Sequence, residues 1–207
     1  MALLYSQKEE SSIIGVWEIS ESLSELEKHP SLTSYIEESL SFKSKRRRRE
    51  WLAVRLLLVS LLDEVKEIAY LPSGNPYLVD QSYFISISHT RGYAAVILHK
   101  TKRVSIDIEY HSERVLGIVP RFVRDDEKFY ATSDSCTPLL IWSAKEVLFK
   151  LLDDTGVDFK KHLRILPFPL ADSGHFIAYD YKTSNQGTAH LIQYYTTSDY
   201  VVVFCIE

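Results

Sequence analysis

Two carboxylates share one segment of the chain, at a spacing that could bind a metal ion. The segment Val104–Tyr110 reads VSIDIEY and alternates apolar with polar residues, which is typical of a strand with one buried face. On such a strand Asp107 and Glu109 lie on the same face, about 6.5–7 Å apart at the backbone. Neighbouring carboxylates repel unless water screens them or a cation bridges them, and Mg²⁺ is often held by one or two carboxylates plus phosphate oxygens. Taken alone, such alternation is more often an ordinary solvated strand face, and a metal site is the functional alternative.

A third carboxylate follows in a segment with helical periodicity, residues 139–152. Glu146 lies off the apolar stripe of this helix and has Lys150 one helical turn later. In that arrangement Glu146 could face the strand pair, while Lys145 and Lys150 could contact anionic oxygens. The alternative is a surface Glu–Lys pair, which contributes only a few tenths of a kcal/mol.

Ser88 and His89 stand at the end of another predicted strand, just before the turn Arg91–Gly92. Their side chains could hydrogen-bond a phosphate at that strand end. A histidine that serves only the structure is the alternative, and it is the more common role for a lone histidine in such a place. Nothing around Ser88 indicates a nucleophile elbow or a catalytic triad.

A basic run covers the start of the best predicted helix, residues 45–62. Six of the seven residues from Lys43 to Arg49 are basic. Because positive charge at a helix start is unfavourable to the helix dipole, an anionic partner would stabilise this run. Arg55 follows among apolar neighbours, where an arginine often holds a phosphate or an internal carboxylate. A nucleic-acid-binding module is an alternative interpretation, which the net charge of −4 disfavours.

The elements that must position these groups belong to an ordinary globular chain. The 207 residues are 45% hydrophobic and 25% charged, enough for one large domain or two small ones. The longest apolar run, Val201–Ile206, is too short for a membrane span, and the first residues do not resemble a signal peptide. Two cysteines, Cys136 and Cys205, exclude a disulfide framework. We therefore expect a cytoplasmic protein.

The predicted elements form two similar series, each with a strand, helical segments and then several strands. The first half contains strands 13–19, 77–79, 83–89 and 93–99 and helices 31–41 and 45–62. The second contains strands 103–110, 163–166, 175–181, 190–196 and 200–206, a mixed stretch 113–130 and helix 139–152. We expect two αβ subdomains, residues 1–102 and 103–207, with the metal site in the second.

In order and spacing these segments resemble the 4′-phosphopantetheinyl transferase superfamily, in its two-subdomain, surfactin-synthetase-activating form. The family's Gly-x-Asp-x-Glu strand and Trp-x-x-Lys-Glu-x-x-x-Lys helix, its most specific motifs, are matched by residues 105–109 and 142–150. Weaker matches are its basic helix at 49–55, its Gly-Lys-Pro turn at 74–76 and its Ser-His strand end at 88–89. Two positions depart from the pattern, since Asn75 replaces the usual lysine and Ser105 the usual glycine.

This resemblance implies an α+β fold of two similar subdomains packed as a pseudo-two-fold dimer within one chain. It implies transfer of the 4′-phosphopantetheine arm of coenzyme A to a serine of an apo acyl or peptidyl carrier protein. The products are the holo carrier protein and adenosine 3′,5′-bisphosphate. A monomer without nucleic-acid or membrane partners is expected. A non-catalytic relative that binds carrier proteins is the alternative.

The resemblance also assigns roles to residues. Mg²⁺ would be held by Asp107, Glu109 and Glu146. Catalysis would use Glu146 as the base, with Lys150 and Lys145 stabilising developing charge. Coenzyme A would be bound by Ser88, His89, Arg49, Arg55 and Asn75. Asn75 should weaken that binding by the loss of one cation, and Ser105 should place extra atoms beside Asp107.

Overall fold

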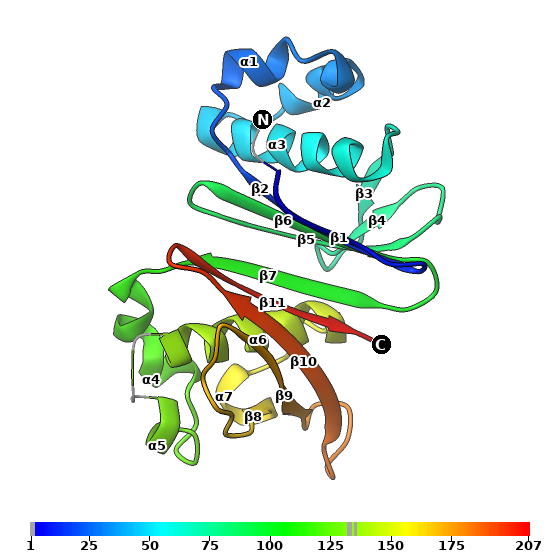
Figure 1. Cartoon of the computed structure of the whole chain (residues 1–207). Coiled ribbons are helices and arrows are strands. Elements are labelled where there is room, and N and C mark those ends of the chain that lie inside the picture. Colours follow the sequence, from blue (N-terminus) through cyan, green and yellow to red (C-terminus); the bar gives the residue numbers. More distant parts are fainter. Residues whose placement is uncertain (1–2, 132–133, 135) are drawn as a thin grey trace.

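The computed structural model describes residues 3–131, 134 and 136–207 of the chain. Helices and strands are mixed in an α+β fold of four layers (Figure 1). Two antiparallel sheets pack against each other, and each sheet has one long helix on its outer face. Three hydrophobic cores therefore form, one under each helix and one between the sheets.

The first half of the chain builds one sheet and its helix. Its strands are ordered β1-β2-β6-β5, and a separate two-stranded ribbon pairs β3 with β4. The elements are β1 (Leu3–Lys8), β2 (Ser12–Glu18), α1 (Leu23–Glu27), a 3₁₀ helix (Pro30–Tyr35), α2 (Ile36–Ser39), α3 (Lys45–Leu62), β3 (Ile68–Tyr70), β4 (Pro76–Leu78), β5 (Phe84–Thr90) and β6 (Tyr93–His99).

The second half builds a sheet ordered β7-β11-β10-β9-β8, covered by α6. The elements are β7 (Val104–Tyr110), a 3₁₀ helix (Glu113–Ile118), α4 (Val119–Phe122), α5 (Lys128–Ala131), α6 (Cys136–Leu152), α7 (Phe159–His162), β8 (Leu163–Ile165), β9 (Ser173–Asp180), β10 (Thr188–Thr196) and β11 (Tyr200–Ile206).

Helix α3 has the bounds that the sequence predicts. It begins at the cap residue Ser44, whose side chain accepts from the backbone N–H of Arg47, and it ends where Asp63 turns into the left-handed region. Its apolar face packs closely on β2 at Gly15, because a Cβ there would lie 2.7 Å from the side chain of Leu61. Only glycine allows this approach of helix and strand without displacing the leucine.

The two sheets meet with β5 beside β7. Ile106 and Ile108 of β7 point into the core between the sheets, as the alternating pattern predicts. The backbone N–H of Ile106 donates to Oγ of Ser86 on β5 at 3.2 Å. The polar faces of β5 and β7 are thereby brought together beneath α6, which also contacts β7. This junction of β5, β7 and α6 positions the candidate site.

Most of the predicted elements are present within a few residues of the expected bounds. The expected helix 31–41 is instead a 3₁₀ helix followed by the short α2. Helix α6 begins earlier than predicted, because Asp134 accepts from the backbone N–H groups of Cys136 and Thr137 and so caps it. Both cysteines are free thiols. Among the described residues, none of the helices is long and apolar enough to span a bilayer. The pseudo-two-fold relation and the boundary at residue 102 stay predictions.

Candidate active site at the junction of β5, β7 and α6

Asp107 is the most enclosed carboxylate of the site, with only 5% of its surface exposed. Its Oδ1 accepts two hydrogen bonds, from Oγ of Ser88 at 2.9 Å and from Nζ of Lys150 at 2.9 Å. Its Oδ2 is buried and has no hydrogen-bond partner among the described residues. Such an unpartnered buried oxygen is costly for the protein alone and is suited to a cation.

Glu109 lies two residues further along the same face of β7. Its Oε2 accepts from Oγ1 of Thr90 at 2.9 Å, and its Oε1 accepts from Nε1 of Trp142 at 3.3 Å. Burial and the negative charge of Asp107 raise the pKa of Glu109, while the two hydrogen bonds oppose this rise. The polar partners thus come from β5 and α6, the elements on either side of the strand.

Glu146 faces this pair from α6, as the helical spacing predicts. Burial, reinforced by the nearby charge of Asp107, raises the pKa of Glu146 to about 7, although Lys150 opposes the shift. The three carboxylates share a cavity of about 350 Å³. The cavity is lined by Ile87, Ser88, His89, Asp107, Glu109, Trp142, Glu146 and Lys150. The structure therefore brings Glu146 of α6 to the carboxylate pair of β7, which stands far from it in the sequence.

The chemistry of this donor set fits a hard divalent cation. It offers three carboxylates and one unpartnered oxygen. The pKa values of Glu109 and Glu146 are raised first by burial and then by neighbouring negative charge, which a cation would relieve. However, no group of three Asp, Glu, His or Cys side chains in the described part of the chain is already arranged around one point as metal ligands. Oxygens of Asp107 and Glu109 already accept hydrogen bonds from protein donors, and a cation would use the remaining lone pairs of the carboxylates, including those of Oδ2 of Asp107.

The two lysines of α6 have different environments. Nζ of Lys150 lies in the cavity and also donates to the carbonyl oxygen of Ile106 at 2.9 Å. Lys145 is instead fully buried, and its Nζ contacts Oε2 of Glu127 at 2.7 Å and the carbonyl oxygen of Phe122 at 2.7 Å. Burial lowers the pKa of Lys145, and Glu127 opposes this. Lys145 thus does not reach the carboxylates, contrary to the role expected from the sequence.

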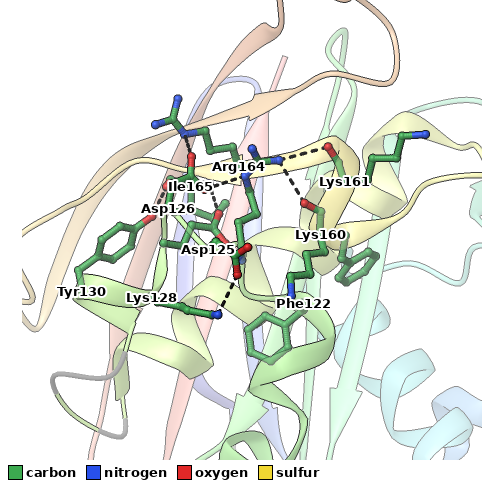
Figure 2. A network of polar contacts seen from close by, with 12 residues as sticks. Phe122, Asp125, Asp126, Lys128, Tyr130, Lys160, Lys161, Arg164 and Ile165 are labelled. Carbon is green, nitrogen blue, oxygen red and sulfur yellow. Dashed lines mark hydrogen bonds and ion pairs between the residues drawn. The ribbon is translucent and has the colours of Figure 1, made fainter.

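Figure 2 shows a polar network of the second half that includes Asp126, Arg164 and Ile165. Glu127 contacts this network through hydrogen bonds from the backbone. The backbone N–H groups of Ile165 and Arg124 both donate to Glu127, at 2.7 and 2.8 Å. Arg124 and Arg164 pair with Asp126, at 2.9 and 3.0 Å. Lys145 and Glu127 therefore connect α6 to the loop after α4 and to β8. Their role is to stabilise the fold.

His89 and the basic run border one cavity of about 560 Å³, next to the carboxylates. Arg46, and not Arg49, is the residue of the run that lines it. Oε1 of Glu50 pairs with Nε of Arg46 at 2.8 Å, and its Oε2 lies 3.8 Å from Nδ1 of His89. Burial lowers the pKa of His89, and Glu50 opposes this. Ser88 lines the neighbouring cavity, where it donates to Asp107.

The remaining residues expected to bind coenzyme A lie elsewhere. Arg55 is 2% exposed, and its guanidinium lies 3.5 Å from the ring centroid of Trp51 and donates to Oη of Tyr70 at 3.2 Å. Neither Arg49 nor Arg55 is among the described residues that line the two cavities around the carboxylates. Asn75 borders a third cavity of about 670 Å³, to which Lys150 also contributes.

Ser105 does not extend into the carboxylate cavity. It is fully buried, and its Oγ donates to the carbonyl oxygen of Val147 on α6 at 2.8 Å. The extra atoms that replace the family's glycine are therefore accommodated as a contact between β7 and α6.

Comparison with known families agrees with this geometry. A family model described as the 4′-phosphopantetheinyl transferase superfamily matches residues 103–205. The match spans β7 to β11 and so includes Asp107, Glu109, Glu146 and Lys150. The chain belongs to this superfamily of enzymes, which transfer 4′-phosphopantetheine from coenzyme A. No curated protein matches the chain.

Several residues of the site are absent from the sequence-based assignment. Thr90 and Trp142 hold Glu109, and Glu50 lies between Arg46 and His89. Trp142 opens the family's helix motif and Glu50 follows the basic run, so both were visible as neighbours of assigned residues. The Thr90–Glu109 contact joins the two halves, and the others join separate elements within one half, so no local pattern reveals them.

Proposed function

We propose that this protein transfers the 4′-phosphopantetheine arm of coenzyme A to a serine of an apo acyl or peptidyl carrier protein. The observation that supports this most directly is the cavity in which Asp107, Glu109, Glu146 and Lys150 meet. Transfer from a pyrophosphate requires positive charge near the phosphate oxygens and a positioned hydroxyl nucleophile. A divalent cation bound by the carboxylates and the neighbouring ammonium of Lys150 could supply the charge, and a carboxylate could orient the hydroxyl.

In this reaction the serine oxygen forms a bond to the phosphorus that bears the pantetheine arm. The bond from that phosphorus to the bridging oxygen breaks, and adenosine 3′,5′-bisphosphate leaves with the electron pair. Mg²⁺ held by Asp107, Glu109 and Glu146 would supply charge neutralisation on the phosphate oxygens. Lys150, 2.9 Å from Asp107, would bind an oxygen of the same pyrophosphate. Glu146 would accept the serine proton, directly or through water, since its carboxylate lies in the same cavity as the other groups of the site.

The first half of the chain would bind the nucleotide. His89 and Arg46 line the cavity next to the carboxylates, so both could contact the 3′-phosphate of coenzyme A. We retain Asn75 only as a neighbour of the nucleotide and do not assign phosphate binding to Arg49, Arg55 or Lys145. A division into a nucleotide-binding subdomain, residues 1–102, and a metal-binding subdomain, residues 103–207, would follow.

Mass spectrometry of an apo carrier protein tests this proposal. The carrier is incubated with the protein, Mg²⁺ and coenzyme A, and we expect its mass to rise by one phosphopantetheine arm. Parallel reactions without coenzyme A, or with the metal chelated, should leave the mass unchanged. If acyl and peptidyl carriers bind the protein but none gains mass, the protein is a non-catalytic carrier-binding relative and the proposed activity is wrong.

A further inference from the structure

The C-terminal end of α6 is contacted by a residue from the other half of the chain. The last carbonyl groups of a helix have no partner within the helix. Nδ2 of Asn75 donates to the carbonyl oxygen of Lys150 at 2.8 Å and to Oδ1 of Asp153 at 2.6 Å. Asn75 belongs to the turn between β3 and β4, so this contact joins the first half directly to the helix that includes Glu146.

Two residues of the second half contact neighbouring carbonyls of the same helix. Ser105 on β7 donates to the carbonyl oxygen of Val147 at 2.8 Å. The guanidinium of Arg103, just before β7, donates to the carbonyl oxygen of Leu151. Together with Asn75, these side chains bond three carbonyls in the last two turns of α6.

These contacts surround the residues on which the proposed chemistry depends. Glu146 precedes Val147, and the backbone of Lys150 is itself the acceptor of the Asn75 amide. The side chain of Lys150 reaches Asp107 and the carbonyl oxygen of Ile106 at 2.9 Å each. A small shift of α6 along β7 would break both bonds. The position of α6 relative to β7 therefore decides whether Nζ of Lys150 contacts Asp107.

The contacts of Asn75 and Ser105 occur where this chain departs from its family's motifs, at the usual lysine and the usual glycine. Glycine has no side chain to donate the Ser105 bond. Lysine lacks the short, planar amide with which Asn75 contacts two acceptors. Both departures therefore add hydrogen bonds to the same helix.

We infer that Asn75 and Ser105 are positioning residues that fix α6 over β7 so that Lys150 meets Asp107. This inference rests on the proposed transfer reaction and assigns Asn75 a different role from the lysine it replaces. Asn75 acts through the helix end and does not substitute for a cation that binds coenzyme A.

Steady-state kinetics separates these two roles. Asn75→Ala should lower kcat about tenfold, as expected for two lost hydrogen bonds, and should change the KM for coenzyme A less than twofold. Asp153→Gly removes one acceptor while glycine tolerates the left-handed backbone found there, φ 54°. Its effect should not add to that of Asn75→Ala, whereas Asp153→Asn, which keeps an acceptor oxygen, should resemble the wild type. Asn185→Ala, which removes the side chain of an exposed asparagine, is the matched control.

The opposite pattern would overturn the inference. If Asn75→Ala raises KM while kcat is kept, or if Asn75→Lys binds coenzyme A more tightly at unchanged kcat, Asn75 contacts the substrate. Additive effects of Asn75→Ala and Asp153→Gly would also contradict a role that acts through the helix end.

A second measurement needs no enzymatic activity. Acetylation of lysines by acetic anhydride, followed by peptide mass spectrometry, reports how firmly Lys150 is held relative to the exposed Lys43. Asn75→Ala and Ser105→Ala should each raise the relative rate at Lys150 about threefold or more, because one lost bond corresponds to that range. An unchanged ratio in both folded variants would refute the inference. If the wild type transfers nothing to any carrier, the proposed function fails, while this ratio still decides whether the two residues position Lys150.

Discussion

Nζ of Lys150 on α6 donates to Oδ1 of Asp107 on β7 at 2.9 Å, and the same carboxylate oxygen also accepts from Ser88 on β5. One oxygen atom thus joins the three elements that form the site. Because both donors use Oδ1, the other oxygen of Asp107 is buried without a hydrogen-bond partner among the described residues. Oδ1 of Asp107 therefore holds the three elements together, and Oδ2 is suited to a ligand.

Asp107→Asn should therefore abolish transfer without unfolding the protein. The amide oxygen of asparagine can still accept from Ser88 and Lys150, but the negative charge for a cation is lost. We expect transfer to fall on the order of 100-fold or more, with a melting temperature close to that of the wild type. Transfer to an apo carrier and thermal unfolding measure the two effects, and the exposed Asp172→Asn is the control. Near-normal transfer by Asp107→Asn would contradict the assignment of Asp107 as a metal ligand.

Arg46 and His89 should affect binding of coenzyme A more than the chemical step. They line the same cavity, and a contact to a remote phosphate acts equally on bound substrate and transition state. Arg46→Ala and His89→Ala should each raise the KM for coenzyme A about fivefold, which corresponds to roughly 1 kcal/mol, with a smaller change in kcat. Lys43→Ala, at the start of the basic run, is the control. A loss confined to kcat in His89→Ala would instead place this residue at the reacting phosphate.

The sequence predicts the carboxylate site well because its signals are local. Alternation in β7 places Asp107 and Glu109 on one face, and helical spacing turns Glu146 away from the apolar stripe of α6. Both patterns report which side of one element a residue occupies. The family's motifs add that these two elements meet, which periodicity alone does not show.

The sequence does not predict the surroundings of Lys145 and Arg55, because these depend on contacts with residues far away in the chain. Lys145 stands beside Glu146 in the sequence but points to Glu127, which lies 18 residues before it in the chain. The sequence suggests Arg55 as a phosphate ligand. In the structure it is buried, with its guanidinium over the ring of Trp51 and hydrogen-bonded to Tyr70. Helical spacing identifies Trp51 as a neighbour of Arg55, but Tyr70 and Glu127 lie too far along the chain for a local pattern to identify them as partners of these buried charges.

Stability near neutral pH should depend on the ionisation of Glu146. Its pKa is about 7 in the folded chain, against an ordinary value of 4.5, so folding favours the protonated carboxyl. That stabilisation is fully present below about pH 4.5 and is lost as the pH rises to about 7 and above. Glu146→Gln is neutral at every pH, so its melting temperature minus that of the wild type should increase from pH 4.5 to pH 8 in metal-free buffer.

Two comparisons test the origin of this pH dependence. The exposed Glu10→Gln should show no such trend, because its carboxylate is solvated in the folded protein. Addition of Mg²⁺ should reduce the difference between Glu146→Gln and the wild type at pH 8, since a cation stabilises the ionised carboxylate. A difference that stays constant from pH 4.5 to pH 8 would show that Glu146 is not shifted in this way.

Lys145 should matter for stability more than for catalysis. Its ammonium and the Glu127 carboxylate are both fully buried, so removal of one partner leaves an uncompensated charge in the interior. Lys145→Met should lower the free energy of unfolding by about 3–5 kcal/mol, measured by urea denaturation. Lys182→Met is a suitable control, because Lys182 lies 3.5 Å from Asp154 in a partly exposed pair that should contribute about 0–1 kcal/mol. Transfer by the folded fraction of Lys145→Met at low temperature should persist. If this variant is as stable as the wild type and transfers nothing, Lys145 acts in catalysis, as its place beside Glu146 in the sequence first indicates.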